Sequence, residues 1–174
     1  MFVSRKGVVK KTELAAYRHV RAAGVNAINI TDDDQLIDVQ LTNGDDQIIL
    51  ATRQGIAIRF HEWDVRSMGR VATGVRGIRL REDDEVIGMV VTHPDLNANA
   101  TLLVVTQHGR GKRTAIDDYR LQSRGGLGVI NLKLNEQTGK VVTKQPARGR
   151  QIVAPVVVVV ILRRRGQLDH RCLL

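Results

Sequence analysis

Basic side chains recur at two fixed positions along this sequence, and their common chemistry is the binding of anions. Three similarly placed glycines mark the repeat: Gly7, Gly55 and Gly109. Four residues after each stands a lysine or arginine, and eleven residues after each stands an arginine; the two sets are Lys11, Arg59, Arg113 and Arg18, Arg66, Arg120. A regular series of cations suits a partner with regularly spaced negative charge, such as duplex DNA.

Further bases lie close to these positions, and we include them among the candidate DNA contacts: Lys10, Arg21, Arg70, Arg76, Lys112 and Arg124. The acids concentrate elsewhere, in 32–46 and 82–85. This segregation predicts a surface that is electropositive on one side. The net charge of +9 is a weaker argument for DNA binding. Residues 1–142 hold 20 bases and 17 acids, and most of the net charge comes from 143–174, which hold 7 bases and one acid.

Two other interpretations of these charges stay open at this point. The basic face could dock an acidic protein partner, or the bases could simply solvate a β-surface. Catalysis has little support, because the paired acids at Asp32–Asp34 and Asp117–Asp118 have no recurring histidine or nucleophile beside them. The five histidines and the single Cys172 show no metal-ligand spacing. We expect no catalytic centre, metal site or cofactor in this chain.

A repeat of about 50 residues must position these bases. The segments 2–12, 50–60 and 104–114 align on the first three glycines, and the segments GVNAINI (24–30), GVRGIRL (74–80) and GVINLKL (128–134) align on Gly24, Gly74 and Gly128. A period of this length is typical of propeller blades or solenoids. Each first segment reads as a hairpin whose glycine supplies a positive φ.

The apolar and polar residues of the second segments alternate, which predicts strands at 24–30, 74–80 and 128–134. Short apolar strands are expected at 36–41, 86–91 and 140–142, and a helical turn fits within 13–20. The fold class is therefore all-β, with about three four-stranded blades at 1–46, 47–100 and 101–142.

The segment 143–174 departs from the repeat, with five consecutive valines and almost no acid. We interpret it as an aberrant basic and valine-rich tail, disordered or produced by a shifted reading frame. Its apolar run, 152–162, is interrupted by Pro155 and is too short to span a bilayer. The sequence also begins without a signal peptide, so we expect a soluble cytoplasmic protein with no membrane partner.

Three strings carry a family resemblance: RKGVVKKT (5–12), MGRVATGVRGIRLREDDEVIG (68–88) and GRGKRTAIDDYRLQSRGGLGVINLKL (109–134). Together they resemble successive blades of the C-terminal DNA-wrapping domain of bacterial DNA gyrase A, over about residues 2–142. The similar domain of topoisomerase IV is the nearest competitor. The resemblance implies a β-pinwheel, a propeller-like disc whose neighbouring blades exchange strands and whose basic rim bends DNA.

The resemblance also implies a place in a larger enzyme. The partners would be duplex DNA, the catalytic domain of gyrase A and the gyrase B protein, near the chromosome. ATP and Mg²⁺ would be used elsewhere in that ATP-dependent supercoiling complex, and the chain itself would not be an enzyme. Three blades would wrap less DNA than the six usual in the family.

The family's wrapping motif, a glycine-rich basic heptapeptide, has only a degenerate counterpart here. It comprises Gln122, Ser123, Arg124, Gly125, Gly126, Leu127 and Gly128. Two of its basic positions are replaced by Ser123 and Leu127. Its glycines either let backbone amides approach phosphate or merely shape a loop.

Overall fold

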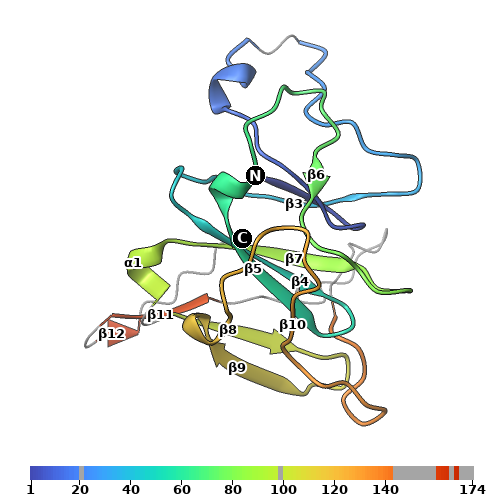
Figure 1. The fold of residues 1–174 in the computed structure, drawn as a ribbon, viewed down its shortest axis with the longest axis vertical. Coiled ribbons are helices and arrows are strands. Elements are labelled where there is room, and N and C mark those ends of the chain that lie inside the picture. The colour runs from blue at the N-terminus through green and yellow to red at the C-terminus, as the bar shows by residue number, and fades with distance from the viewer. Residues whose placement is uncertain (20–21, 98–99, 143–159, 165–166, 169–174) are drawn as a thin grey trace.

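The computed structural model describes residues 1–19, 22–97, 100–142, 160–164 and 167–168, which form three small sheets stacked side by side (Figure 1). The first sheet contains β1 (Phe2–Ser4), β2 (Val8–Lys10) and β3 (Leu36–Val39). The second contains β4 (Gln47–Thr52), β5 (Ile56–His61) and β7 (Val86–Thr92). The third contains β8 (Ala100–Val105), β9 (Gly111–Ala115), β11 (Val160–Arg164) and β12 (Gln167–Leu168). We call them blades 1, 2 and 3.

Blades 1 and 2 each complete their sheet with a strand from the following blade. The strand β6 (Val75–Arg76) pairs with β2, and β10 (Val129–Ile130) pairs with β5, both antiparallel. The resulting orders are β3-β1-β2-β6 and β10-β5-β4-β7. This confirms the all-β class, the four-stranded blades and the strand exchange that the resemblance implied.

Short helical turns follow the hairpins at equivalent places in the repeat. They are the 3₁₀ turns η1 (Leu14–Tyr17), η2 (Glu62–Asp64) and η3 (Ile116–Asp118), and the one-turn helix α1 (Pro94–Asn97) precedes β8. The helical turn expected within 13–20 is therefore present as η1.

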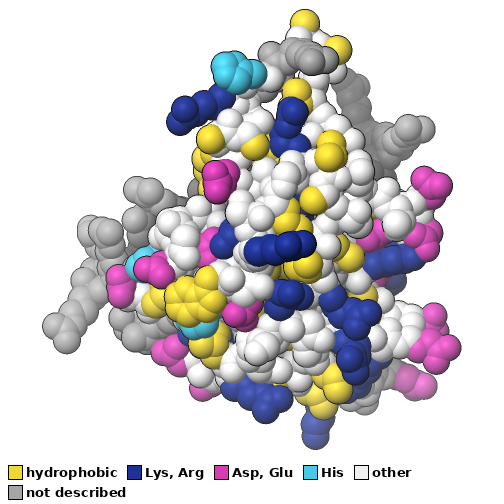
Figure 2. Space-filling model, turned by 45° about the horizontal axis from the view of Figure 1, so that its top comes forward, with side chains coloured by type: hydrophobic (Ala, Val, Ile, Leu, Met, Phe, Trp, Pro, Cys, Tyr) yellow, Lys and Arg dark blue, Asp and Glu magenta, His cyan; other side chains and the backbone are white. Residues whose placement is uncertain are grey.

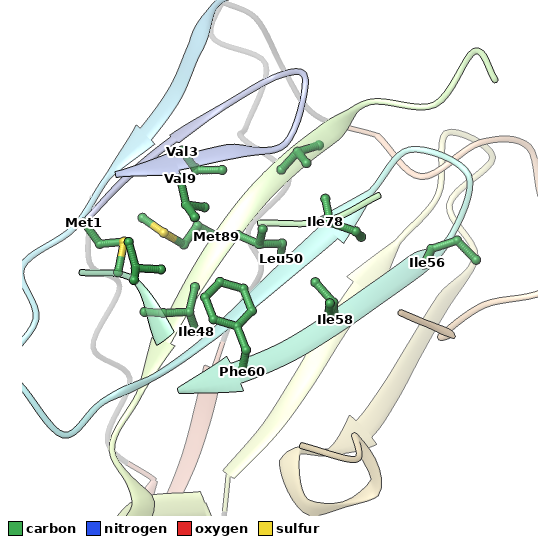
Figure 3. Close-up of a cluster of buried hydrophobic side chains, with 12 residues drawn as sticks. Met1, Val3, Val9, Ile48, Leu50, Ile56, Ile58, Phe60, Ile78 and Met89 are labelled. Carbon is green, nitrogen blue, oxygen red and sulfur yellow. The ribbon is translucent and has the colours of Figure 1, made fainter. Parts of the chain in front are cut away.

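Blade 2 is buried on both faces, and its strand sequences show why. Successive side chains of a strand point to opposite faces, so Ile48 and Leu50 of β4 pack toward blade 1, whereas Ile49 and Ala51 pack toward blade 3. The near-continuous apolar run QIILAT suits such a sandwiched strand. Figure 3 shows the first of these clusters, in which Val3 and Val9 of blade 1 lie against Leu50 of blade 2.

One predicted strand is wrong. Residues 24–30 carry the same pattern as β6 and β10 but form no strand in the structure. The physical reason lies in the exchange, because β6 and β10 take their hydrogen bonds from the blade before them. Among the described residues no blade precedes blade 1, so 24–30 has no strand to pair with.

Blade 3 also differs from expectation, at the end of the repeat. The predicted 140–142 strand is present only as an isolated bridge of Val141 to Thr106, with backbone hydrogen bonds from Gln107 to Lys140 and from Val142 to Val105 on either side. Farther along β8 the neighbouring strand is β11, whose Val160 lies opposite Leu102. The structure describes only 160–164 and 167–168 of the segment 143–174, so its interpretation as an aberrant tail stays a prediction. The remainder of that segment lies outside the described residues.

The hairpin glycines confirm the predicted backbone requirement, with φ of +80°, +80° and +74° at Gly7, Gly55 and Gly109. L-residues rarely adopt such angles. At Gly55 the following blade adds a second constraint, since a Cβ there would lie 2.4 Å from the Leu132 carbonyl oxygen. At Gly109 a Cβ would meet nothing within 4 Å.

These two glycines make a matched pair for a stability measurement. We expect Gly55→Ala to lower the free energy of unfolding by about 3 kcal/mol or more, because backbone strain adds to a clash between blades. Gly109→Ala carries only the strain and should cost about 1–2 kcal/mol. Urea unfolding of both variants checks the difference, and equal losses would show that the Gly55 contact is unimportant.

Candidate nucleic-acid interface

The basic residue four positions after the hairpin glycine joins neighbouring blades in two of the three repeats. Lys11 Nζ donates to the Glu62 carbonyl oxygen at 3.0 Å and lies 3.8 Å from the buried Glu62 carboxylate. Arg59 Nη1 donates to the carbonyl oxygen of Ile116 at 2.8 Å. Glu62 and Ile116 begin η2 and η3, so the same contact is made at equivalent places. We call it the inter-blade latch.

Arg59 is only 7% exposed and is held by more than the latch. Its Nη1 also donates to the Tyr119 carbonyl oxygen at 3.0 Å, and its Nε donates to Gln47 Oε1 at 2.7 Å. Hydrogen bonds from a charged donor are stronger than neutral ones. The buried Arg59 therefore uses its charge between blades and not toward DNA, whereas a DNA contact of the half-buried Lys11 stays a prediction.

Lys10 is wholly buried, so its inclusion among the DNA contacts is also wrong. Its ammonium donates to the carbonyl oxygens of Ala27 and Arg70 and lies 5.2 Å from the centre of the Phe2 ring. Burial lowers the pKa of this ammonium, because removal from water disfavours the charged form. Lys10 ties together three segments of the chain and cannot reach a phosphate.

The degenerate wrapping motif packs against blade 2. Arg124, half-buried, donates through Nε to the Asp64 carbonyl oxygen at 2.7 Å and through Nη1 to the Arg76 carbonyl oxygen at 3.1 Å. The Gly125 amide donates to the Gly77 carbonyl oxygen at 2.6 Å. This amide and the Nε and Nη1 donors of Arg124 are thus directed at protein, which favours the interpretation of the motif as a shaped loop. The two residues that depart from the family pattern, Ser123 and Leu127, are both exposed.

The arginines eleven positions after the hairpin glycines behave differently from the latch residues. Arg18, Arg66 and Arg120 are all exposed, and each follows the 3₁₀ turn of its blade. Among the described residues none of them forms an ion pair with an acid. We call these three the rim arginines.

The other predicted contacts divide between exposed and engaged side chains. Arg76 and Arg113 are exposed, whereas Arg70 is half-buried. Lys112 is exposed but donates to the Asn131 carbonyl oxygen at 2.9 Å. Arg21 lies outside the described residues. Figure 2 shows Lys and Arg side chains following one another down the middle of one face, with Asp and Glu mostly toward its sides.

Basic side chains near the acidic turns form ion pairs with the acids of those turns. Lys6 pairs with Asp33, and Arg53 Nη1 lies 2.9 Å from Glu85 Oε1, with Arg5 at 3.9 Å from the same carboxylate. The hydrogen bond from Lys6 holds the pKa of Asp33 below its ordinary value. Such exposed pairs add little stability, but they cancel the positive charge at this end of the blades.

Sequence analysis missed a further repeated base. Arg79 and Lys133 stand five residues after Gly74 and Gly128, and both side chains are exposed. The alignment on the second glycines would have found them, but the equivalent residue in blade 1 is Asn29, which breaks the series.

The described residues lack the features of two other kinds of site. Within them, no cluster of three or more His, Cys, Asp or Glu side chains could hold a metal ion. The same part of the chain contains no helix that is long and apolar enough to cross a membrane.

The latch predicts unequal effects at equivalent positions. Arg59→Met removes the charge-assisted hydrogen bonds to the carbonyl oxygens of Ile116 and Tyr119 and to Gln47, so we expect a loss of about 2–4 kcal/mol in unfolding free energy. Arg113→Met changes an exposed side chain at the same repeat position and should stay within about 0.5 kcal/mol of the parent. Chemical unfolding checks both, and a small effect at Arg59 would contradict the structural role of the latch.

Comparison with known proteins gives a consistent family. A family model described as "DNA gyrase C-terminal domain, beta-propeller" matches residues 1–43, 46–93 and 100–143 in succession. The DNA gyrase A protein of Haloquadratum walsbyi is 48% identical over 139 residues, and that of Deinococcus deserti is 46% identical over 153 residues. These matches cover 80% and 87% of this chain but only 16% and 19% of the relatives.

Solved structures agree with this fold. The C-terminal domain of a DNA topoisomerase IV superposes with a TM-score of 0.75 at 32% identity, covering 82% of this chain and 44% of that one. A DNA gyrase A C-terminal domain superposes with a TM-score of 0.71 at 26% identity, covering 82% of this chain and 46% of that one. With three successive blades matched and strands exchanged between them, this chain belongs to the family of DNA gyrase C-terminal domains.

Proposed function

We propose that this chain binds duplex DNA along the side that carries the rim arginines and bends the DNA around it. The proposal rests on the different surroundings of the two repeated basic positions, four and eleven residues after the hairpin glycine. The first position contacts the following blade in two repeats, through Lys11 and Arg59. The second position, held by the rim arginines, is exposed in all three blades, and among the described residues no acid pairs with it. A cation kept exposed at equivalent places is available to phosphate.

The energetics favour several modest contacts over one strong site. Smoothly bending a DNA site of 20–30 base pairs by 40–90° costs on the order of 1–6 kcal/mol. Each phosphate neutralised by a lysine or arginine releases condensed counterions, which contributes favourable free energy at moderate salt. Arg18, Arg66 and Arg120 supply one such contact per blade, and the exposed Arg79 and Lys133 extend the basic surface.

We further propose that the chain serves as the wrapping portion of a gyrase-type topoisomerase. Its relatives are DNA gyrase A proteins, of which it spans less than a fifth. DNA cleavage and ATP hydrolysis would then belong to the catalytic domain of gyrase A and to gyrase B, with ATP and Mg²⁺ bound there. The chain would act in the cytoplasm, on the chromosome, and would need no cofactor of its own.

The rim arginines predict a specific salt dependence. We expect the full chain with Arg18, Arg66 and Arg120 all changed to Gln to bind a duplex more weakly than the parent at low salt. The slope of log affinity against log salt should fall in magnitude by about 2.7, since each phosphate contact contributes roughly 0.9. Fluorescence anisotropy with a labelled duplex across a salt series measures both quantities.

A second triple variant provides the control, because it removes the same charge elsewhere. Arg5, Lys6 and Arg53 changed to Gln should bind within about threefold of the parent, since those bases already face acids and only long-range attraction is lost. Both variants retain the basic segment 143–174, so its contribution is constant. Equal losses in the two variants would mean that net charge, not the position of the rim arginines, governs binding.

A further inference from the structure

The acidic turns of blades 1 and 2 serve the hairpins beside them. These turns, TDDDQ (31–35) and REDDE (81–85), directly precede β3 and β7. Asp34 Oδ1 accepts the Lys6 amide at 2.9 Å, and Asp84 Oδ1 accepts the Gln54 amide at 2.9 Å. Three acids in the first turn, and four acids with one base in the second, give each a net charge of −3. Each turn therefore holds the hairpin backbone and repels anions.

The corresponding turn of blade 3, NEQTGK (135–140), lacks this acidity. Two backbone hydrogen bonds establish the correspondence: the Gln107 amide donates to the Lys140 carbonyl oxygen at 3.0 Å, as the Arg53 amide donates to that of Glu85 at 2.9 Å. Lys140 therefore stands where blade 2 has Glu85. With one acid and one base, the turn of blade 3 has no net charge.

The turn of blade 3 closes without a carboxylate. Asn135 Oδ1 accepts the Thr138 amide at 2.9 Å, and Thr138 Oγ1 accepts the Asn135 amide at 2.8 Å. A neutral amide and a hydroxyl thus satisfy backbone groups of this turn, whereas aspartates satisfy backbone groups in the other two. Basic side chains at this end of blade 3 keep their charge available to an external anion.

Beside this turn, at the junction of blades 2 and 3, lies an open cleft of about 980 Å³. The charged side chains that line it are one acid, Glu136, and four bases, Arg53, Arg81, Lys133 and Lys140. Arg53 already pairs with Glu85. The other three bases are exposed, and among the described residues none of them forms an ion pair. We call Arg81, Lys133 and Lys140 the cleft cations.

The cleft lies close to the rim arginine of blade 3. Ile130, which lines the cleft, pairs with Ile56 at the start of β5. Leu121, next to Arg120, bridges to Arg59, three residues farther along the same strand. At about 3.3 Å per residue these two places are roughly 10 Å apart along β5. The major groove of B-DNA is about 12 Å wide, so a single duplex can present phosphates to both.

We propose that the cleft cations bind phosphate groups of the same duplex that the rim arginines bind. This inference rests on the proposed DNA-binding function and adds a direction to it. The turns of blades 1 and 2 repel the duplex at their hairpin ends, whereas blade 3 attracts it there. Bound DNA therefore crosses to the hairpin end of the blades at blade 3.

A double variant of the full chain, Arg81→Gln with Lys140→Gln, tests the cleft separately from the rim. We expect it to bind a duplex more weakly than the parent, with the slope of log affinity against log salt lower in magnitude by about 1.8. Fluorescence anisotropy across a salt series measures both. Both side chains are exposed, so thermal unfolding should be unchanged.

The matched control removes two bases where acids already neutralise them. Arg5→Gln with Lys6→Gln should bind within about twofold of the parent, because both bases face acidic turns. A change of opposite sign comes from Glu136→Gln, which removes the acid of the cleft and should tighten duplex binding by about twofold.

The outcomes separate this inference from the function on which it rests. A parent without duplex affinity, or a rim-arginine variant that binds as the parent does, would overturn the proposed function and this inference together. A rim variant that binds weakly while the cleft variant matches its control would overturn the cleft inference alone.

Calorimetric titration with tripolyphosphate distinguishes a free polyanion from DNA as the ligand of the cleft. Tripolyphosphate binding that the cleft variant loses, together with unchanged duplex affinity, would assign the cleft to a small anion and contradict the proposal. Loss of duplex affinity in the cleft variant, with the reduced salt slope, is the result that supports it.

Discussion

Neighbouring blades hold together because the carbonyl oxygens of Gly7 and Gly55 accept backbone amides from the blade that follows. That contact requires the backbone of one blade to approach that of the next more closely than a Cβ allows, as the 2.4 Å distance at Gly55 illustrates. Glycine satisfies the positive φ and the close approach together. The exchanged strands, the two apolar clusters and the latch all depend on this approach, since they form only where one blade lies directly against another.

The junction also explains why basic residues with similar spacing have different roles. A cation four residues after the glycine lies at the seam, where carbonyl oxygens at the start of a 3₁₀ turn surround it. A cation eleven residues after the glycine lies beyond that turn and remains in water. Lys11 and Arg59 therefore stabilise the array, while Arg18, Arg66 and Arg120 stay available to an external anion. Acidic turns at the other end of the blades neutralise the bases beside them.

Patterns within a single repeat predicted the fold well, because hairpin glycines and alternating strands are local features. Contacts between repeats were harder to predict. The burial of Lys10 and Arg59 depends on carbonyl groups contributed by segments distant in sequence, and nothing beside those residues indicates it. Residues 24–30 failed as a strand for the same reason, since their pattern is correct but their partner must come from another blade. The pairing of β11 with β8 was not predicted, because the segment 143–174 was interpreted as a tail outside the repeat.

The linking number of a closed plasmid tests most directly whether a bound duplex is wrapped around the rim. A nicked plasmid is sealed by ligase with increasing amounts of the full chain, the protein is removed, and the topoisomers are separated on a gel. Wrapping with a fixed hand predicts that the mean linking number shifts in one direction in proportion to bound chain, and that the shift is strongly reduced when the rim arginines are changed to Gln. A saturated plasmid with an unchanged linking number would mean that DNA binds without being wrapped, and would contradict the account.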